Sequence, residues 1–416
     1  MNSIFLSWGI ALAATAGVIL RPFKWPEAIW AVAGALLLVV LGLLPVSIAW
    51  DAVGKGTDVY LFLIGMMLLS ELGRREGLFE WIAAIAVNHA KGSPRRLFLL
   101  VYLVGVVVTT FLSNDAAAVV LTPAVFAAAK KADTNPMPLL YVCAFIANAA
   151  SFVLPISNPA NLVLYANHPP ALGLWVARFA VPSILSIVAT FAMLRWTQRG
   201  DLVGTCARDL PVEKLSAAGK VTLAGICLTA IALLIVSAFD MQLGLPTAIL
   251  GILTAVVVMV KERQSPFALV RDISWSVLPL VAGLFVLVEM LVHTGVIARL
   301  SALLTMAVQH NPSGAAVVSG VAVAFGSNAI NNLPAGLIAS ATALSAHSPE
   351  RVVDALLIGV DLGPNLSITG SLATILWLSS IRREGMDVGF MQFLKVGVLV
   401  MVPALVLALG ARLLIS

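Results

Sequence analysis

The sequence predicts an all-helical protein that crosses a membrane many times and consists of two inverted repeats. About ten transmembrane helices, two re-entrant hairpins and two broken helices are expected. Of the 416 residues, 60% are hydrophobic and 11% are charged, whereas a soluble domain has about 25% charged residues. Apolar blocks follow one another from residue 4 to residue 415. Polar interruptions also occur at corresponding places in the two halves of the chain.

The first repeat is expected to occupy residues 1–200. Its first apolar block has no cleavage-site pattern, so we interpret it as a span and not as a signal peptide. Continuous spans are predicted at residues 4–21, 26–50, 58–74 and 172–196, with an extension of the third as an interfacial helix to residue 88.

A helical hairpin is predicted at residues 96–130. Its apolar runs, 97–112 and 116–129, supply roughly 15 residues each, and a membrane-crossing helix needs about 20. We therefore expect the hairpin to enter the membrane and return, with Ser113, Asn114 and Asp115 at its tip. A charged group at that depth costs about 2.5–3.5 kcal/mol on insertion scales, so Asp115 should face protein or water.

A broken helix is predicted at residues 138–166, because Pro155 and Pro159 lie in its middle. Proline removes a backbone donor and clashes with the preceding turn. The backbone is therefore expected to open near Ser157 and Asn158.

The second repeat is expected at residues 218–416, after a cytoplasmic linker of residues 201–217. It contains a hairpin at 312–347 and a broken helix at 350–380. A shift of 218 places Gly65, Glu71 and Gly77 on Gly283, Glu289 and Gly295, and Ser113-Asn114 on Asn331-Asn332. A shift of 212 places Ile156-Ser157 on Ile368-Thr369. Matching interruptions in two halves indicate a transporter with its site between the repeats.

The basic residues predict the orientation. They cluster near residues 21–24, 74–96, 130–131, 195–220, 261–271 and 382–383. If these loops are cytoplasmic, both ends of the first hairpin lie inside, each half has an odd number of spans, and both termini lie outside. Twelve full spans would give the same loop parity, so that alternative stays open. The net charge of +5 is therefore an orientation signal and not a sign of nucleic-acid binding.

Four polar clusters are expected to converge near the middle of the membrane and bind a small polar solute. Hydroxyl and amide groups at broken helix ends can both donate and accept hydrogen bonds. The candidate substrate-binding residues are Ser113, Asn114, Ser157, Asn158, Asn161, Asn331, Asn332, Asn365, Ser367, Thr369 and Ser371. The alternative is that these residues only cap helix ends and satisfy backbone groups in lipid.

Four carboxyl groups at membrane depth are candidates for carrying a proton, because removal from water disfavours the charged form of a carboxyl group. Asp115 is the first choice because it lies at the hairpin tip, and Asp361 is the second. Glu71 and Glu289 form a symmetric pair, and they could instead brace the scaffold against Arg74 or His293.

The sequence predicts no cofactor and no enzymatic activity. Cys143, Cys206 and Cys227 lack metal-binding or redox spacing. The glycine-rich segments lack the lysine and the strand–loop–helix context of a phosphate-binding loop. The energy source is therefore an ion gradient, or ATP used by a separate subunit.

Four segments of the chain resemble the arsenite efflux permeases (ArsB type) of the ion transporter superfamily. They are Phe111-Leu-Ser-Asn-Asp-Ala-Ala-Ala118, Leu154-Pro-Ile-Ser-Asn-Pro-Ala-Asn161, Asn331-Asn-Leu-Pro-Ala-Gly336 and Asp361-Leu-Gly-Pro-Asn-Leu-Ser-Ile-Thr-Gly-Ser-Leu-Ala373. The resemblance implies export of arsenite and antimonite as neutral trihydroxides across the bacterial inner membrane in exchange for protons, with an associated soluble ATPase as another energy source. It also implies an elevator-like movement, as in the related sodium-coupled dicarboxylate carriers.

The sequence departs from the Ser-Asn-Thr motifs of those carriers. Asp115 stands at the Thr position of the first motif and Pro159 at that of the second, and Asn331-Asn332-Leu333 occupies the second hairpin. These differences favour a protonatable group over sodium. Three alternatives remain: a sodium-coupled anion or dicarboxylate transporter, a channel subunit that anchors a soluble ATPase, and a sodium/proton exchanger.

Overall fold

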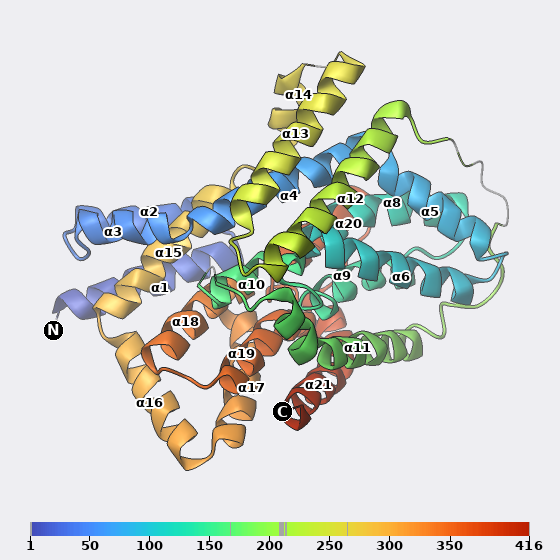
Figure 1. Ribbon diagram of the computed structural model, residues 1–416. Helices are drawn as coiled ribbons and strands as arrows, with labels where there is room; N and C mark the ends of the chain where they lie inside the picture. Colours follow the sequence, from blue (N-terminus) through green and yellow to red (C-terminus); the bar gives the residue numbers. More distant parts are fainter. Residues whose placement is uncertain (1, 167, 208–211, 213, 264, 416) are drawn as a thin grey trace.

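The computed structural model describes residues 2–166, 168–207, 212, 214–263 and 265–415, and this part of the chain is helical throughout with no β-strand (Figure 1). The helices of the first half are α1 (Asn2–Leu20), α2 (Glu27–Val40), α3 (Val46–Lys55), α4 (Thr57–Arg75), α5 (Leu78–His89), α6 (Pro94–Leu112), α7 (Asn114–Ala116), α8 (Thr122–Lys131), α9 (Met137–Ala149), α10 (Pro159–Leu164) and α11 (Leu172–Thr197). Those of the second half are α12 (Ala217–Ala238), α13 (Gly244–Glu262), α14 (Pro266–Asp272), α15 (Val277–His293), α16 (Val296–His310), α17 (Pro312–Ile330), α18 (Asn332–Ser345), α19 (Glu350–Leu362), α20 (Leu372–Arg383) and α21 (Phe390–Leu414).

Both predicted hairpins and both predicted broken helices are present. The first hairpin consists of α6, α7 and α8, with a π-helical stretch at Ala117–Leu121, and the second consists of α17 and α18. The first broken helix runs through α9, a short 3-10 helix (η3, Pro155–Ser157) and α10, and the second runs through α19, a 3-10 helix (η4, Gly363–Leu366) and α20.

Two expectations about helix length were wrong. The predicted span 26–50 is two helices, α2 and α3, because Gly42 takes a left-handed conformation with φ of 67° and Pro45 precedes the first turn of α3. The first arm of the first hairpin is also longer than its predicted apolar run of residues 97–112. α6 and α17 each have 19 residues and are long and apolar enough to cross a bilayer.

The structure is that of a polytopic membrane protein. Within the described residues, six helices are long and apolar enough to cross a membrane, namely α6, α11, α12, α13, α17 and α21. The count rises to eight if each of two bent pairs, α3 with α4 and α15 with α16, is one span. The bends are 47° and 71°. The number of ten spans, the inversion of the repeats and the outer position of both termini stay predictions.

Equivalent helices of the two halves pack reciprocally. α4 of the first half lies against α13 of the second, and α15 of the second half lies against α2 of the first (Figure 1). A Cβ atom added at Gly251 of α13 would lie 2.7 Å from the carbonyl oxygen of Gly65, and one added at Gly283 of α15 would lie 2.9 Å from that of Ala31. Small residues at such crossings let two backbones approach closely in a membrane.

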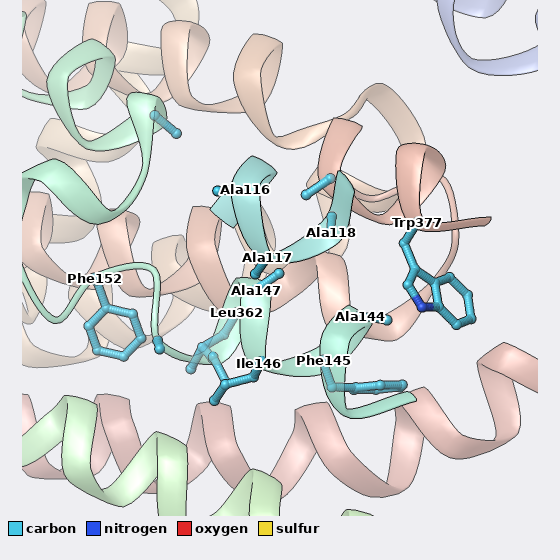
Figure 2. Packing of buried hydrophobic residues seen from close by; sticks show 14 of the residues in the cluster. Ala116, Ala117, Ala118, Ala144, Phe145, Ile146, Ala147, Phe152, Leu362 and Trp377 are labelled. Carbon is cyan, nitrogen blue, oxygen red and sulfur yellow. The ribbon is translucent and has the colours of Figure 1, made fainter. Parts of the chain in front are cut away.

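The interrupted helices also cross between the halves. α10, from the first broken helix, contacts α18 of the second hairpin, and α20 contacts α7 and α8 of the first. Figure 2 shows the alanine run Ala116–Ala118 of the first hairpin beside Ala147 of α9, in the apolar core that also contains Leu362 of α19. Because alanine is small, the hairpin tip can reach the broken helices in the centre of the molecule.

Candidate transport site

The two hairpin tips adopt the same unusual backbone conformation. Ser113 has φ of 94° and ψ of 161°, and Asn331, 218 positions later, has φ of 74° and ψ of 152°. A residue other than glycine in this region costs of order 1–3 kcal/mol, so the surrounding packing must impose it. In both hairpins this residue ends the first arm and starts the second. The side chains that follow, Asn114 and Asn332, are thereby placed at equivalent points.

The first break is held together by its own polar residues. Asn158 caps α10, because its Oδ1 accepts a hydrogen bond from the backbone N–H of Ala160 at 3.0 Å. Ser157 donates to the carbonyl oxygen of Thr110 at 2.9 Å and so joins the break to the first hairpin. Asn161 donates to the carbonyl oxygen of Ser151 at 2.9 Å. Asn161 therefore satisfies a carbonyl group that Pro155, which has no N–H, leaves open, and Ser157 satisfies one at the end of α6.

The second break is closed in a similar way. Ser367 donates to Oδ1 of Asn328 at 2.8 Å, and Thr369 donates to the carbonyl oxygen of the same residue at 2.9 Å. Ser371 caps α20 by accepting from the backbone N–H of Thr374 at 3.1 Å. These contacts hold the second break against α17.

Asn365 and Asn331 also form hydrogen bonds that hold the second break in place. Asn365 is fully buried, donates to the carbonyl oxygen of Phe145 and accepts from Asn148, both at 3.0 Å. Asn331 donates to the carbonyl oxygen of Thr369 at 3.4 Å. The polar side chains of the second break, which is one of the four predicted clusters, therefore bind neighbouring groups of the protein.

Four of the predicted residues line one internal cavity. Asn114 and Asp115 of the first tip, Asn158 of the first break and Asn332 of the second tip surround a space of about 30 Å³. Apolar residues of α4, α15 and α20 complete the wall, including Leu63, Val281 and Leu372, and the described residues that line the cavity include no Arg or Lys. The two halves of the chain therefore meet at a polar spot within an apolar enclosure.

Two of the polar residues that line this space, Asn114 and Asp115, carry acceptor oxygens without partners among the described residues. Asp115 makes no hydrogen bond or ion pair with any described residue, although it is partly buried. Oδ1 of Asn114 is buried and also has no partner there. A buried acceptor without a partner is costly. A ligand that donates hydrogen bonds, or a cation, would satisfy both groups.

Asp361 does not line the cavity itself but contacts Asn158, which does. It is fully buried in α19, and its Oδ1 accepts a hydrogen bond from Nδ2 of Asn158 at 2.6 Å. Its second oxygen, Oδ2, has no hydrogen-bond partner among the described residues. Asn158 therefore links this carboxyl group of the second half to the cavity.

A second cavity connects the first tip with the molecular surface. Its volume is about 100 Å³, and it shares Leu63, Asp115, Pro159 and Val277 with the inner one. It extends past Ser113 to Glu71 of α4 and Asp272 of α14, and again has no Arg or Lys in its lining. Asp115 is thus accessible from the side that carries Arg74 and Arg75, which the basic loops predict to be cytoplasmic.

Ion pairs close the outer rim of this cavity. Arg75 pairs with Asp272 at 2.7 Å and with Glu71 at 3.1 Å. The Arg75 guanidinium beside Asp272 holds the pKa of that carboxyl group below its usual value. These pairs attach α14 to α4 at the opening of the cavity.

Glu71 and Glu289 differ from Asp115 in having cationic partners. Nε of Arg74 donates to Glu71 at 2.8 Å, as the bracing alternative expected. Glu289 pairs with Lys55 of α3 at 2.6 Å and not with His293. The symmetric pair therefore joins neighbouring helices of the scaffold, although Glu71 also lines the outer cavity.

Sequence reasoning missed two buried polar centres. Asn148 of α9 donates to Asn365 and, at 3.3 Å, to Thr374. Asn148 lies 213 positions before Asp361. Asn148 extends from the first broken helix to the second break, and Asp361 extends from the second broken helix to the first break. Asp354, fully buried in α19, pairs with Arg412 at 2.7 Å and accepts from the Tyr165 hydroxyl at 2.6 Å. Both centres were detectable as polar residues in apolar segments.

This fold and site define a secondary transporter: a polytopic helical protein whose hairpins and interrupted helices meet around an internal polar cavity. The family model CitMHS, described as "Citrate transporter", matches residues 15–360. The chain therefore belongs to the CitMHS family of transporters and is not an enzyme.

Curated relatives match over nearly the full length. The arsenical pump membrane protein of Escherichia coli strain K12 is 28% identical over 400 residues, covering 91% of each chain. That of Yersinia enterocolitica is 28% identical over 399 residues, covering 93% of this chain and 92% of the relative. An uncharacterized transporter of Mycobacterium tuberculosis strain H37Rv is 24% identical over 416 residues, covering 96% of each chain.

A solved structure shares the fold. The YdaH transporter of Alcanivorax borkumensis superimposes with a TM-score of 0.57 at 14% sequence identity. The match covers 88% of this chain and 86% of the other. At this identity the likeness concerns the fold and not the solute.

Proposed function

We propose that this protein is a proton-coupled antiporter of the bacterial inner membrane that exports arsenite and antimonite as neutral trihydroxides. The observation that carries the proposal is the chemistry of the inner cavity. Among the residues that the structure describes, its lining includes a carboxyl group and an amide oxygen without partners and no cationic side chain. A trihydroxide offers three O–H donors and no negative charge, so it complements such a cavity. Full-length similarity to proteins named arsenical pump membrane protein supports the same solute class.

In this proposal Asp115 takes up and releases the proton. It is accessible through the outer cavity, and no described residue holds its carboxyl group in one state. Asp361 is the second candidate, because it contacts the cavity through Asn158 and has one unpartnered oxygen. Glu71 and Glu289 contribute through the ion pairs that brace the scaffold.

Solute binding is assigned to three amides and one hydroxyl. Asn114, Asn158 and Asn332 line the inner cavity, and Ser113 lines the approach to it. We assign the remaining candidates to shaping the breaks and the second tip, since their side chains bond to neighbouring backbone or side-chain groups. They are Ser157, Asn161, Asn331, Asn365, Ser367, Thr369 and Ser371.

The second candidate is a sodium-coupled anion transporter, which the family description as a citrate transporter favours. The unpartnered oxygens of Asn114 and Asp115 would suit a sodium ion as well as an O–H donor. A carboxylate solute, however, would face Asp115, Glu71 and Asp272 without a basic residue in either cavity wall. A channel subunit for a soluble ATPase is a third candidate.

Transport by the purified protein in liposomes distinguishes these functions. The interior is loaded at acid pH, and arsenite, antimonite and citrate are supplied in turn outside, with and without sodium and with no ATPase present. We expect uphill accumulation of arsenite and antimonite that follows the pH gradient and ignores sodium. Sodium-dependent citrate uptake without arsenite uptake would exclude the proposal, and flux only down the solute gradient would indicate a channel.

A further inference from the structure

A basic and aromatic patch lies where three long helices end together, away from the transport cavities. Arg195 and Trp196 are in the last turn of α11, and Arg199 follows two residues after its end. Arg95 is in the first turn of α6, and Lys395 is in the second turn of α21. All four cations are exposed. None of them has an ion-pair partner in the described part of the chain, although Asp201 follows Arg199 closely. The patch therefore presents uncompensated positive charge.

Two hollows meet at Trp196. One has a volume of about 420 Å³ and is lined by Arg95, Arg195 and Arg199. The other has a volume of about 300 Å³ and is lined by Arg199 and Lys395. The Arg199 guanidinium lies 5.7 Å from the Trp196 ring, and the Arg195 guanidinium lies 6.0 Å from that of Phe191. Such contacts hold guanidinium groups at the edges of the hollows.

The position of the patch matches a membrane interface. α6, α11 and α21 are all long and apolar enough to span a bilayer, and their ends carry the cations. Trp196 is 51% exposed, as expected of a tryptophan at the headgroup level. Exposed apolar side chains continue from the patch along the same three helices, namely Leu99, Leu103, Ile184, Val188, Leu399 and Val402. A ligand with both phosphate and hydrocarbon parts would therefore be complementary to the whole surface.

We propose that this patch binds an anionic phospholipid, with its phosphates on Arg195, Arg199 and Lys395 and its acyl chains along α6, α11 and α21. Guanidinium groups bind phosphate through paired N–H donors, and basic pockets between helices on the cytoplasmic side are suited to acidic headgroups. Two adjacent hollows that share Arg199 favour a lipid with two phosphates, such as cardiolipin. The proposal does not depend on which solute the protein transports.

The bound lipid would stabilise the helices that support the two breaks. α11 and α21 pack side by side (Figure 1). Ser186 of α11 donates to the carbonyl oxygen of Ala149 at the end of α9, at 3.0 Å. α21 contacts η4 of the second break. A lipid that joins the cytoplasmic ends of α11 and α21 would therefore raise the thermal stability of the whole transporter.

Native mass spectrometry of the delipidated full-length protein tests the proposal. The probes are cardiolipin, phosphatidylglycerol, phosphatidylcholine and inorganic pyrophosphate. Wild type should retain one cardiolipin more tightly than phosphatidylcholine and should gain thermal stability with it. The triple variant Arg195→Gln/Arg199→Gln/Lys395→Gln should bind cardiolipin about tenfold or more weakly.

A matched control removes three exposed cations elsewhere on the same predicted side: Lys261→Gln/Arg263→Gln/Arg383→Gln. It should retain cardiolipin as wild type does. A second variant, Arg195→Lys/Arg199→Lys, keeps the charge but loses the paired N–H donors, so it should bind cardiolipin more weakly than wild type and more tightly than the glutamine variant. Equal lipid retention by the glutamine and wild-type proteins, or equal loss in the control, would overturn the proposal. So would full displacement of cardiolipin by pyrophosphate with the same gain in stability, because the ligand would then be a free anion.

Discussion

Replacing Asp115 by Asn separates proton coupling from the structure of the first hairpin. Asn has nearly the same shape as Asp but carries no titratable proton. Because Asp115 has no hydrogen-bond or ion-pair partner among the described residues, the substitution breaks no contact there. We therefore expect the variant to fold, with a free energy of unfolding within about 1 kcal/mol of wild type.

The expected loss of coupling can be calculated from the driving force. If one proton is exchanged for each neutral solute molecule, one pH unit contributes about 1.4 kcal/mol, which is tenfold accumulation. A membrane potential of 100 mV adds about 2.3 kcal/mol, because one charge moves with each cycle, and this is about 50-fold. In the Asp115→Asn variant both contributions should vanish, and the solute should only equilibrate.

Everted membrane vesicles with an imposed pH gradient provide the assay, with arsenite accumulation at steady state as the readout. Asp58→Asn is the matched control, since Asp58 is a buried carboxylate of α4 whose Oδ1 accepts from the backbone N–H of Gly244 at 2.8 Å. An Asn there keeps an acceptor oxygen, so coupling should persist. If Asp115→Asn vesicles still reach tenfold accumulation per pH unit, Asp115 is not the proton carrier.

Three further substitutions test the scaffold and the rim. Arg412→Leu leaves the fully buried Asp354 without its closest cation, which should cost about 3 kcal/mol or more of stability in a thermal unfolding assay. Gly251→Ala places a Cβ 2.7 Å from the Gly65 carbonyl oxygen and should cost about 1–3 kcal/mol in the same assay, because α4 and α13 must move apart. Asp272→Asn breaks the pair with Arg75 and should change the transport rate but not its pH profile between about pH 5 and pH 8.

The pKa of Asp272 sets the pH range in which its ion pair with Arg75 exists. Arg75 lowers this pKa below the ordinary carboxyl value. The ion pair is therefore present above that ordinary value and is lost only as the pH falls through the lowered pKa. A pH profile that shifts between about pH 5 and pH 8 in Asp272→Asn would mean that the rim itself titrates.

The two scaffold substitutions have simple controls. Arg383→Leu removes an exposed arginine that has no ion-pair partner in the described chain, and it should leave the unfolding midpoint near that of wild type. Gly54→Ala adds a methyl group that, apart from the adjacent residues and the backbone of its own helix, has no described atom within 4 Å, so it should be neutral or stabilising. Equal losses in control and test variants would show that the buried pair and the close crossing are not the cause.

The placement of the hairpins and breaks could be predicted from the sequence alone. Pro155 and Pro159 interrupt an apolar helix for a local reason, since each ring excludes one backbone donor. The signal for the tip at Ser113-Asn114-Asp115 was equally local, because this polar triplet divides an apolar run. The membrane class also followed from residue order.

The direction of each polar side chain was decided by the tertiary structure. Asn158 and Asn161 lie three residues apart, yet Asn158 faces the cavity and Asn161 binds the backbone of its own break. Glu289 pairs with Lys55, which lies 234 residues away in the chain. A proline or a polar triplet acts on its own few neighbours, whereas the partner of a side chain depends on which helices pack together. That packing depends on small residues such as Gly65 and Gly251 at the crossing of helices from different halves.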